Sequence, residues 1–233
     1  MKKIILFVLF CNQLFAGGPT TTVEFIKIDQ FGYKPGDEKV AVIANPITGY
    51  NNAVAFNPGT VYQLRDWTTN AVVFTGTPTA WNTGSTQTQS GDKVWHFTFT
   101  TYTVPGSYYI FDVTNNVGSY RFEINNCVYN DVLKASLRMF YYNRCGMTKA
   151  FPYADTGFVD GICHLGTQQD LDCRLYNNTN ISTSKNLSGG WHDAGDYNKY
   201  VNFAYGALID LLLAYEKYPT VWTDANNIPE SGN

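Results

Sequence analysis

The sequence predicts a multidomain chain: an all-β, immunoglobulin-like sandwich over residues 22–126, followed by a helical region over residues 128–233. Three observations support this prediction. Short runs of β-branched and aromatic residues fill the first half, turn-forming clusters separate those runs, and apolar residues recur at helical spacing only after Cys127. With 233 residues, the chain is long enough to hold two small domains or one large one.

Seven segments of the first half have the composition of short strands, and about seven strands in about 100 residues are typical of an immunoglobulin-like sandwich. Trp95, Phe97 and Phe99 alternate with the residues between them, which indicates a sheet with one buried face. The Cys-Trp-Cys core of antibody domains is absent, so only the architecture is predicted. The segments are VEFIKIDQFGY, KVAVIANP, VYQLRDW, AVVFTGT, VWHFTFTTYTV, SYYIFDV and SYRFEIN.

Two helices are predicted after Cys127. The first begins near Asn130 or Asp131, either of which can cap it. The second ends before Pro219. Both carry an apolar stripe of the kind that faces a core: Leu133, Leu137, Phe140 and Tyr141 in the first, and Ala204, Leu208, Leu211, Leu212 and Tyr215 in the second. The long irregular stretch between them, residues 146–190, is of a length that is usually functional or disordered.

Residues 1–17 have the layout of a secretory signal peptide: two lysines, a short apolar run and small residues at its end. The apolar run is too short to span a bilayer, and no later segment is long and apolar enough, so we expect a secreted protein without a membrane span. Sixteen basic residues against 19 acidic ones give a net charge of −3, which argues against a nucleic-acid partner. The 37 aromatic residues (17 Tyr, 15 Phe and 5 Trp) suit a carbohydrate ligand.

Residues 189–201, GGWHDAGDYNKYV, place Asp193 and Asp196 three positions apart among glycines. Two carboxylates at this spacing can share one small volume, where one can take a proton from water while the other holds that water. Gly189, Gly190 and Gly195 would allow a tight turn beside them. The alternative is that Asp196 caps the following helix. An EF-hand calcium loop does not fit the spacing, and two acids would repel a phosphate.

Cys145, Cys163, His164 and His192 form a set of two thiols and two imidazoles, the number and type of ligands that tetrahedral zinc prefers. Their intervals are long and irregular. In an exported chain the alternative is a Cys145–Cys163 disulfide with His164 as an ordinary loop residue, and the residues alone favour that alternative.

Three motifs in this order resemble glycoside hydrolase family 9, the inverting cellulases. Residues 189–201 are similar to the family's catalytic signature, and residues 29–35 (DQFGYKP) are similar to the start of the immunoglobulin-like module in one branch of the family. Residues 227–233 (NIPESGN) are the third match. The resemblance implies an endo-β-1,4-glucanase whose catalytic domain is an (α/α)6 barrel, of which residues 128–233 supply only the first helices.

The resemblance also implies roles for the two acids. Asp196 would be the general base that activates the attacking water, and Asp193 would help to hold that water. Inversion needs a second carboxylic acid across the glycosidic bond. In the family this acid is a glutamate near the far end of the catalytic domain, and it has no counterpart here. We therefore expect a truncated chain with an incomplete barrel, inactive by itself, that exposes the apolar stripes of both helices.

The family resemblance changes the interpretation of the cysteines and histidines, because this branch binds a structural zinc through two cysteines and two histidines. Cys145, Cys163, His164 and His192 are similar to those positions, so we expect Zn²⁺ there. Ca²⁺ also occurs in the family, but its ligands cannot be mapped onto this chain.

The expected partner is a β-glucan polysaccharide: cellulose, a mixed-linkage glucan or xyloglucan. A different function is that the sandwich is a non-catalytic module that binds polysaccharide through Trp67, Trp81 or Trp95. In the family the module resembles a packing partner of the catalytic domain, which favours a structural role.

Overall fold

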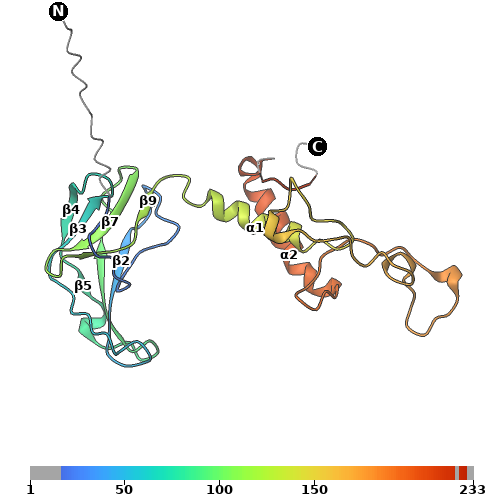
Figure 1. Cartoon of the computed structure of the whole chain (residues 1–233), viewed down its shortest axis with the longest axis horizontal. Coiled ribbons are helices and arrows are strands. Elements are labelled where there is room, and N and C mark those ends of the chain that lie inside the picture. Colours follow the sequence, from blue (N-terminus) through green and yellow to red (C-terminus); the bar gives the residue numbers. More distant parts are fainter. Residues whose placement is uncertain (1–16, 224–225, 230–233) are drawn as a thin grey trace, which may run out of the picture. The chain divides into compact units, whose positions relative to one another are not determined.

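The computed structural model describes residues 17–223 and 226–229, and the chain divides into two units at residue 130 (Figure 1). Residues 1–16 of the predicted signal peptide and residues 230–233 of the third motif lie outside the described residues. Secretion through that peptide stays a prediction. Among the described residues, no helix combines the length and apolar character that crossing a membrane requires.

The first unit is a sandwich of two antiparallel sheets. One sheet has the strand order β1 (Ile26–Lys27), β2 (Val40–Pro46), β6 (Asp92–Thr98) and β5 (Thr79–Ala80). The other has the order β4 (Val72–Gly76), β3 (Tyr62–Asp66), β7 (Gly106–Asp112) and β8 (Val117–Gly118), and β9 (Phe122–Ile124) also pairs with β7. A short 3-10 helix, η1 (Trp81–Gly84), follows β5.

The core of the sandwich lies between the inner faces of the two sheets. Phe97 of β6 is fully buried, and its ring lies near those of Tyr62 and Phe74, with centroids 5.7 and 5.9 Å away. Phe99 is also buried, and Trp95 packs against the same cluster. Because Phe97 and Phe99 are buried and Thr98 between them is exposed, the predicted alternation is confirmed at these residues, as expected of a sheet with one buried face.

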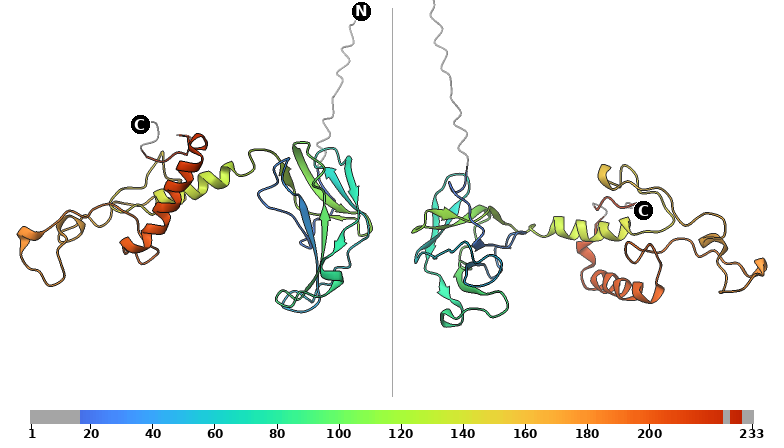
Figure 2. Two further views of the ribbon diagram at one scale, coloured as in Figure 1. Left: turned by 180° about the vertical axis from the view of Figure 1, so that it is seen from behind. Right: turned by 60° about the horizontal axis from the view of Figure 1, so that its bottom comes forward.

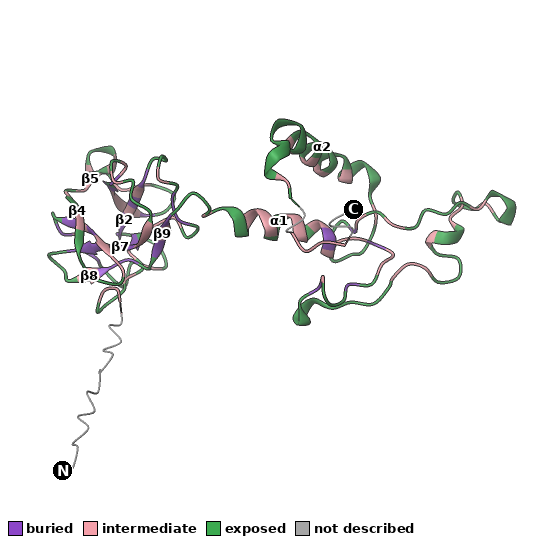
Figure 3. Ribbon diagram, turned by 90° about the horizontal axis from the view of Figure 1, so that it is seen from above, coloured by how far each residue is buried: buried purple, intermediate pink, exposed green. Residues whose placement is uncertain are grey.

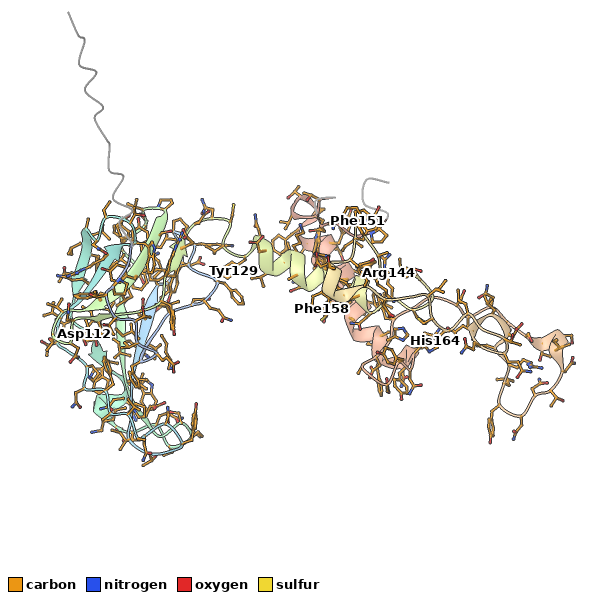
Figure 4. All side chains as sticks on the ribbon, in the orientation of Figure 1. Asp112, Tyr129, Arg144, Phe151, Phe158 and His164 are labelled. Atoms are coloured by element: carbon orange, nitrogen blue, oxygen red, sulfur yellow. The ribbon has the colours of Figure 1, made fainter. Side chains whose placement is uncertain are left out.

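Asp112 is a buried carboxylate at the end of β7, labelled in Figure 4. Its Oδ2 accepts hydrogen bonds from the Tyr62 hydroxyl at 2.7 Å and the Gly59 amide at 2.9 Å. Its Oδ1 accepts from the amides of Thr114 and Asn115. Burial would raise the pKa of Asp112, but these donors outweigh burial and hold the pKa below its ordinary value. The ionised carboxylate ties strand β3 to the turn that follows β7.

The second unit contains two helices, α1 (Asn130–Tyr142) and α2 (Val201–Lys217). Their predicted positions are confirmed, including the end of α2 before Pro219. Three 3-10 turns interrupt the connection between them, η2 (Thr156–Phe158), η3 (Asp170–Asp172) and η4 (Ile181–Thr183), and η5 (Pro219–Val221) follows α2 (Figure 2). Isolated β-bridges join Arg144 to Trp191, Lys149 to Asp160 and Cys173 to Lys185.

The apolar stripes of the two helices differ in burial (Figure 3). In α1, Tyr141 is buried and Leu133, Leu137 and Phe140 are half-buried. No residue of α2 is buried in the part of the chain that the structure describes, and Leu212 has an exposed fraction of 63%. In the second stripe Ala204 and Leu211 are half-buried, whereas Leu208 and Tyr215 are exposed like Leu212. The expected exposure of the apolar stripes is therefore confirmed for most of α2 and is wrong for α1.

Candidate functional site

Four predicted metal ligands meet in the second unit. One ligand atom from each of Cys145, Cys163, His164 and His192 lies within 4.8 Å of every other. The residues come from the end of α1, the middle of the long connection and the motif before α2, and His164 is labelled on that connection in Figure 4. Folding thus brings together residues that are up to 47 positions apart in the sequence (192 − 145).

A short backbone pairing places the first and last of these ligands next to each other. Arg144 and Trp191 form an antiparallel bridge. On one side of it the Cys145 amide donates to the Gly190 carbonyl at 2.8 Å, and on the other the His192 amide donates to the Asn143 carbonyl at 2.8 Å. Gly189 and Gly190 have φ values of +84° and +79°, which favour glycine, so the tight turn predicted from the glycines of the motif is confirmed at these two positions. Gly195 has no such positive φ.

The two cysteines of the cluster are not joined. Their sulfurs lie 4.0 Å apart, about twice the length of a disulfide bond, and the Cys163 sulfur lies 3.5 Å from His192 Nε2. Burial and the neighbouring Cys163 raise the pKa of the Cys145 thiol to about 11. Two sulfurs and an imidazole thus converge at contact distance without a covalent link, and the structure does not contain the disulfide of the alternative interpretation.

The histidines have the hydrogen bonding expected of metal ligands. His192 Nδ1 lies 3.0 Å from the Tyr197 carbonyl oxygen, which can only accept, so Nδ1 carries the proton and Nε2 keeps a lone pair toward the cluster. The Nδ1 atom of His164 is buried, and it has no hydrogen-bond partner among the residues that the structure describes. A buried nitrogen without a partner is costly, and a metal ion would satisfy it. The residues therefore fit a divalent metal with sulfur and nitrogen ligands.

Asp193 and Asp196 are both exposed on the turn between His192 and α2. The Asp196 carboxylate accepts hydrogen bonds from the Asn198 amide at 3.1 Å, the Asn198 side chain at 3.2 Å and the Tyr200 hydroxyl at 3.1 Å. These donors, the Asn198 amide foremost, lower the pKa of Asp196. The carboxylate is ionised at neutral pH, as an aspartate with an ordinary pKa also is, and ionised is the state that a general base requires.

The alternative role of Asp196 as a helix cap is not what the structure shows. α2 begins at Val201, its N-cap is Tyr200, and no side chain caps its first turn. The Asp193 amide donates to the Asn198 carbonyl at 2.9 Å, which closes the turn around Asp196. Tyr197, inside this turn, has a φ of +57°, a conformation that side-chain-bearing residues adopt at a cost. The turn thus holds a strained residue directly beside the candidate base.

One contact links the metal cluster to this turn, since the carbonyl that accepts from His192 belongs to Tyr197. Sequence reasoning did not find this contact, because a backbone carbonyl has no signature in the sequence. It also missed Asp170 and Lys199, whose side chains meet at 2.5 Å beside the cluster.

A cavity of about 220 Å³ lies next to the turn, between the two helices, with Asp193 and Trp191 in its wall.

Two family comparisons cover most of the chain. Residues 21–116 match the domain described as Cellulase N-terminal ig-like domain, and residues 129–231 match the family described as Glycosyl hydrolase family 9. The chain belongs to glycosyl hydrolase family 9. Residues 189–201, the cluster and both helices lie within the second match.

Individual family 9 proteins show the same relationship. The chain is 30% identical over 210 residues to Endoglucanase D of Acetivibrio thermocellus. The matched region covers 89% of this chain and 30% of that protein. It is 30% identical over 251 residues to a xyloglucan-specific endo-beta-1,4-glucanase of Bacteroides ovatus. That match covers 100% of this chain and 38% of that protein. The chain thus spans about a third of the length of these relatives.

Solved family 9 structures share the fold of both units. A metagenome-derived family 9 endoglucanase superposes with a TM-score of 0.69 at 34% identity, over 89% of this chain and 36% of that one. A Zn-binding triple mutant of the family 9 endoglucanase J30 superposes with a TM-score of 0.67 at 30% identity, over 84% of this chain and 33% of that one. The predicted immunoglobulin-like sandwich followed by family 9 helices is therefore confirmed.

Proposed function

We propose that the protein containing this chain hydrolyses β-1,4-glucosidic bonds in cellulose or a related β-glucan, with inversion at the anomeric carbon. The observation that supports this most is the Asp196 carboxylate, which is exposed to solvent and held in one orientation by three hydrogen bonds. Family membership and the endoglucanase relatives supply the reaction class and the substrate class.

In the proposed reaction, Asp196 accepts a proton from a water molecule while Asp193, three residues earlier, holds that water in line. The water oxygen attacks the anomeric carbon, and the bond from that carbon to the leaving sugar oxygen breaks. The leaving oxygen takes its proton from a carboxylic acid on the opposite face of the sugar. Residues 128–233 offer no counterpart of the family's glutamate for this last role, so we expect these residues alone to be inactive.

We infer that Cys145, Cys163, His164 and His192 bind zinc, because two thiolates and two imidazoles are the donors that structural zinc sites use. The zinc would crosslink the end of α1, the long connection and the motif, and it would supply no chemical step. The Zn-binding triple mutant among the related structures supports this choice of metal.

The stereochemistry of the product tests the mechanism. The full-length protein is incubated with a soluble β-1,4-glucan, and proton NMR records the anomeric signals before mutarotation. Inversion predicts that the α-anomer appears first. Early β-anomer would refute the role of Asp196 as a base, and hydrolysis of neither cellulose nor xyloglucan would refute the substrate class.

The second candidate function is a non-catalytic polysaccharide-binding or structural role of the sandwich. Its candidate aromatics Trp67, Trp81 and Trp95 are each half-buried, and Trp95 packs against the core. Flat exposed rings are what a sugar-binding surface requires, so this observation favours a structural role. Packing of the module on the catalytic domain stays a prediction. Retention of the chain on cellulose, abolished by Trp67→Ala, would favour binding instead.

A further inference from the structure

Lys199 belongs to the motif that carries the two aspartates, yet neither the proposed reaction nor the metal cluster uses it. Its Nζ lies 2.5 Å from Oδ2 of Asp170, in the long connection. The two side chains are only 20% and 13% exposed, so most of this ion pair is removed from water. A largely buried pair costs desolvation energy and contributes little net stability, but it can fix one arrangement of the groups around it.

The remaining donors of Lys199 are also used. Its ammonium donates to the carbonyl oxygens of Leu187 at 2.8 Å and Gly189 at 2.9 Å. An ammonium has three N–H groups, so all three have protein partners here. Both carbonyls lie just before Asp193 and Asp196 in the sequence, whereas Lys199 lies just after them. The side chain therefore closes residues 189–199 into a ring that contains both aspartates.

Asp170 extends this contact to the metal cluster. Its Oδ2 lies 3.6 Å from the Cys145 sulfur. Its amide donates to the His164 carbonyl at 3.1 Å, and its carbonyl accepts from the Leu187 amide at 2.7 Å. One residue thus touches a cysteine of the cluster, the backbone of a histidine of the cluster and the segment that precedes the glycine turn.

We propose that Lys199 and Asp170 are positioning residues, which close the loop of residues 189–199 and hold it against the metal cluster so that Asp196 keeps its place. Neither residue has a step of its own in the proposed reaction, and both would act through the loop that carries Asp196. The role of Asp196 rests on the proposed function, whereas the closing of the loop rests on the contacts alone.

Three variants of the full-length protein test the proposal. Lys199→Met keeps the apolar stem and removes the charge and the donors. Lys199→Arg keeps the charge with different geometry. Lys217→Met is the matched control, because Lys217 is an exposed lysine at the end of α2. Amide hydrogen exchange of residues 189–199 is read beside kcat and KM on a soluble β-glucan, and thermal melting verifies that each variant folds.

Lys199→Met is expected to raise exchange in residues 189–199 by about tenfold or more, because hydrogen bonds to charged groups are among the stronger ones. Exchange in the sandwich should not change. We expect kcat to fall by about 100-fold with KM within about twofold, since small misplacements of reacting groups have effects of that size. Lys199→Arg should show a smaller rise in exchange and a smaller fall in kcat than Lys199→Met. Lys217→Met should match the unaltered protein in both measurements.

Unchanged exchange in Lys199→Met, or an equal rise in Lys217→Met, would overturn the proposal. A rise in exchange with kcat unaltered would overturn the positioning of Asp196. If Lys199→Met does not fold, the same exchange and kinetic measurements are made on Asp170→Asn, because asparagine keeps the shape of the aspartate side chain and removes its charge. If the unaltered protein hydrolyses no β-glucan, the proposed function fails, and exchange alone decides whether Lys199 closes the loop.

Discussion

Replacing Cys145 with serine should release the metal ion. Cys145 is buried, and its sulfur is one of the four ligand atoms that converge within 4.8 Å. Structural zinc sites bind with about 10–16 kcal/mol, so an equal share for each of four ligands is about 2.5–4 kcal/mol. At about 1.4 kcal/mol per tenfold, the loss of one ligand corresponds to a roughly 10²- to 10³-fold weaker affinity.

The assay is metal analysis of the purified protein, followed by competition with a chromogenic chelator. We expect about one zinc per chain in the unaltered protein, as a four-ligand site implies, and rapid loss to the chelator from Cys145→Ser. Cys127→Ser is the control, since Cys127 is exposed and lies outside the cluster. A Cys145–Cys163 disulfide found by mass spectrometry, or full metal retention in Cys145→Ser, would refute the reasoning.

Three further predictions concern the acids and the core. Asp196→Asn should lower kcat by about 10²- to 10⁴-fold, as loss of a general base does, whereas Asp210→Asn on α2 should leave it unchanged; equal effects would contradict the assignment. Because the folded-state pKa of Asp112 is depressed, its stabilisation is present above about pH 4 and is lost as pH falls through the folded pKa. Urea unfolding from pH 7 to pH 2 should show this loss, and Asp112→Asn should flatten it. Phe97→Ala should cost about 3–5 kcal/mol in the same unfolding assay, and a cost below 1 kcal/mol would contradict its place in the core.

The sandwich and the helices were predictable because their signals are local. Phe97 and Phe99 alternate with polar residues as a half-buried strand requires, and Pro219 marks the end of the second helix. The absence of buried residues in α2 was predictable only from the resemblance, since an apolar stripe indicates a face that packs and does not name its partner.

The metal cluster was only partly predictable. Cys145 and His192 are far apart in sequence, and the backbone pairing that joins them depends on tertiary folding. The residue types fit zinc, but in an exported chain a disulfide was the favoured interpretation, and the family resemblance was needed to reverse that preference. Lys199 and Asp170 gave no signal at all, because a single long-range ion pair has no periodicity and no fixed interval.

The bridge between Cys173 and Lys185 has a consequence for how this protein tolerates change. It pairs the two ends of the segment that contains η4, and the residues between them are mostly exposed, Tyr176 to 94%. Loops whose ends are joined and whose tips are exposed accept insertions readily. A peptide tag or a fluorescent label placed at residues 177–178 would therefore extend outward from the unit without altering the spacing of the metal ligands or of the two aspartates. This tip is accordingly the natural attachment point for surface immobilisation.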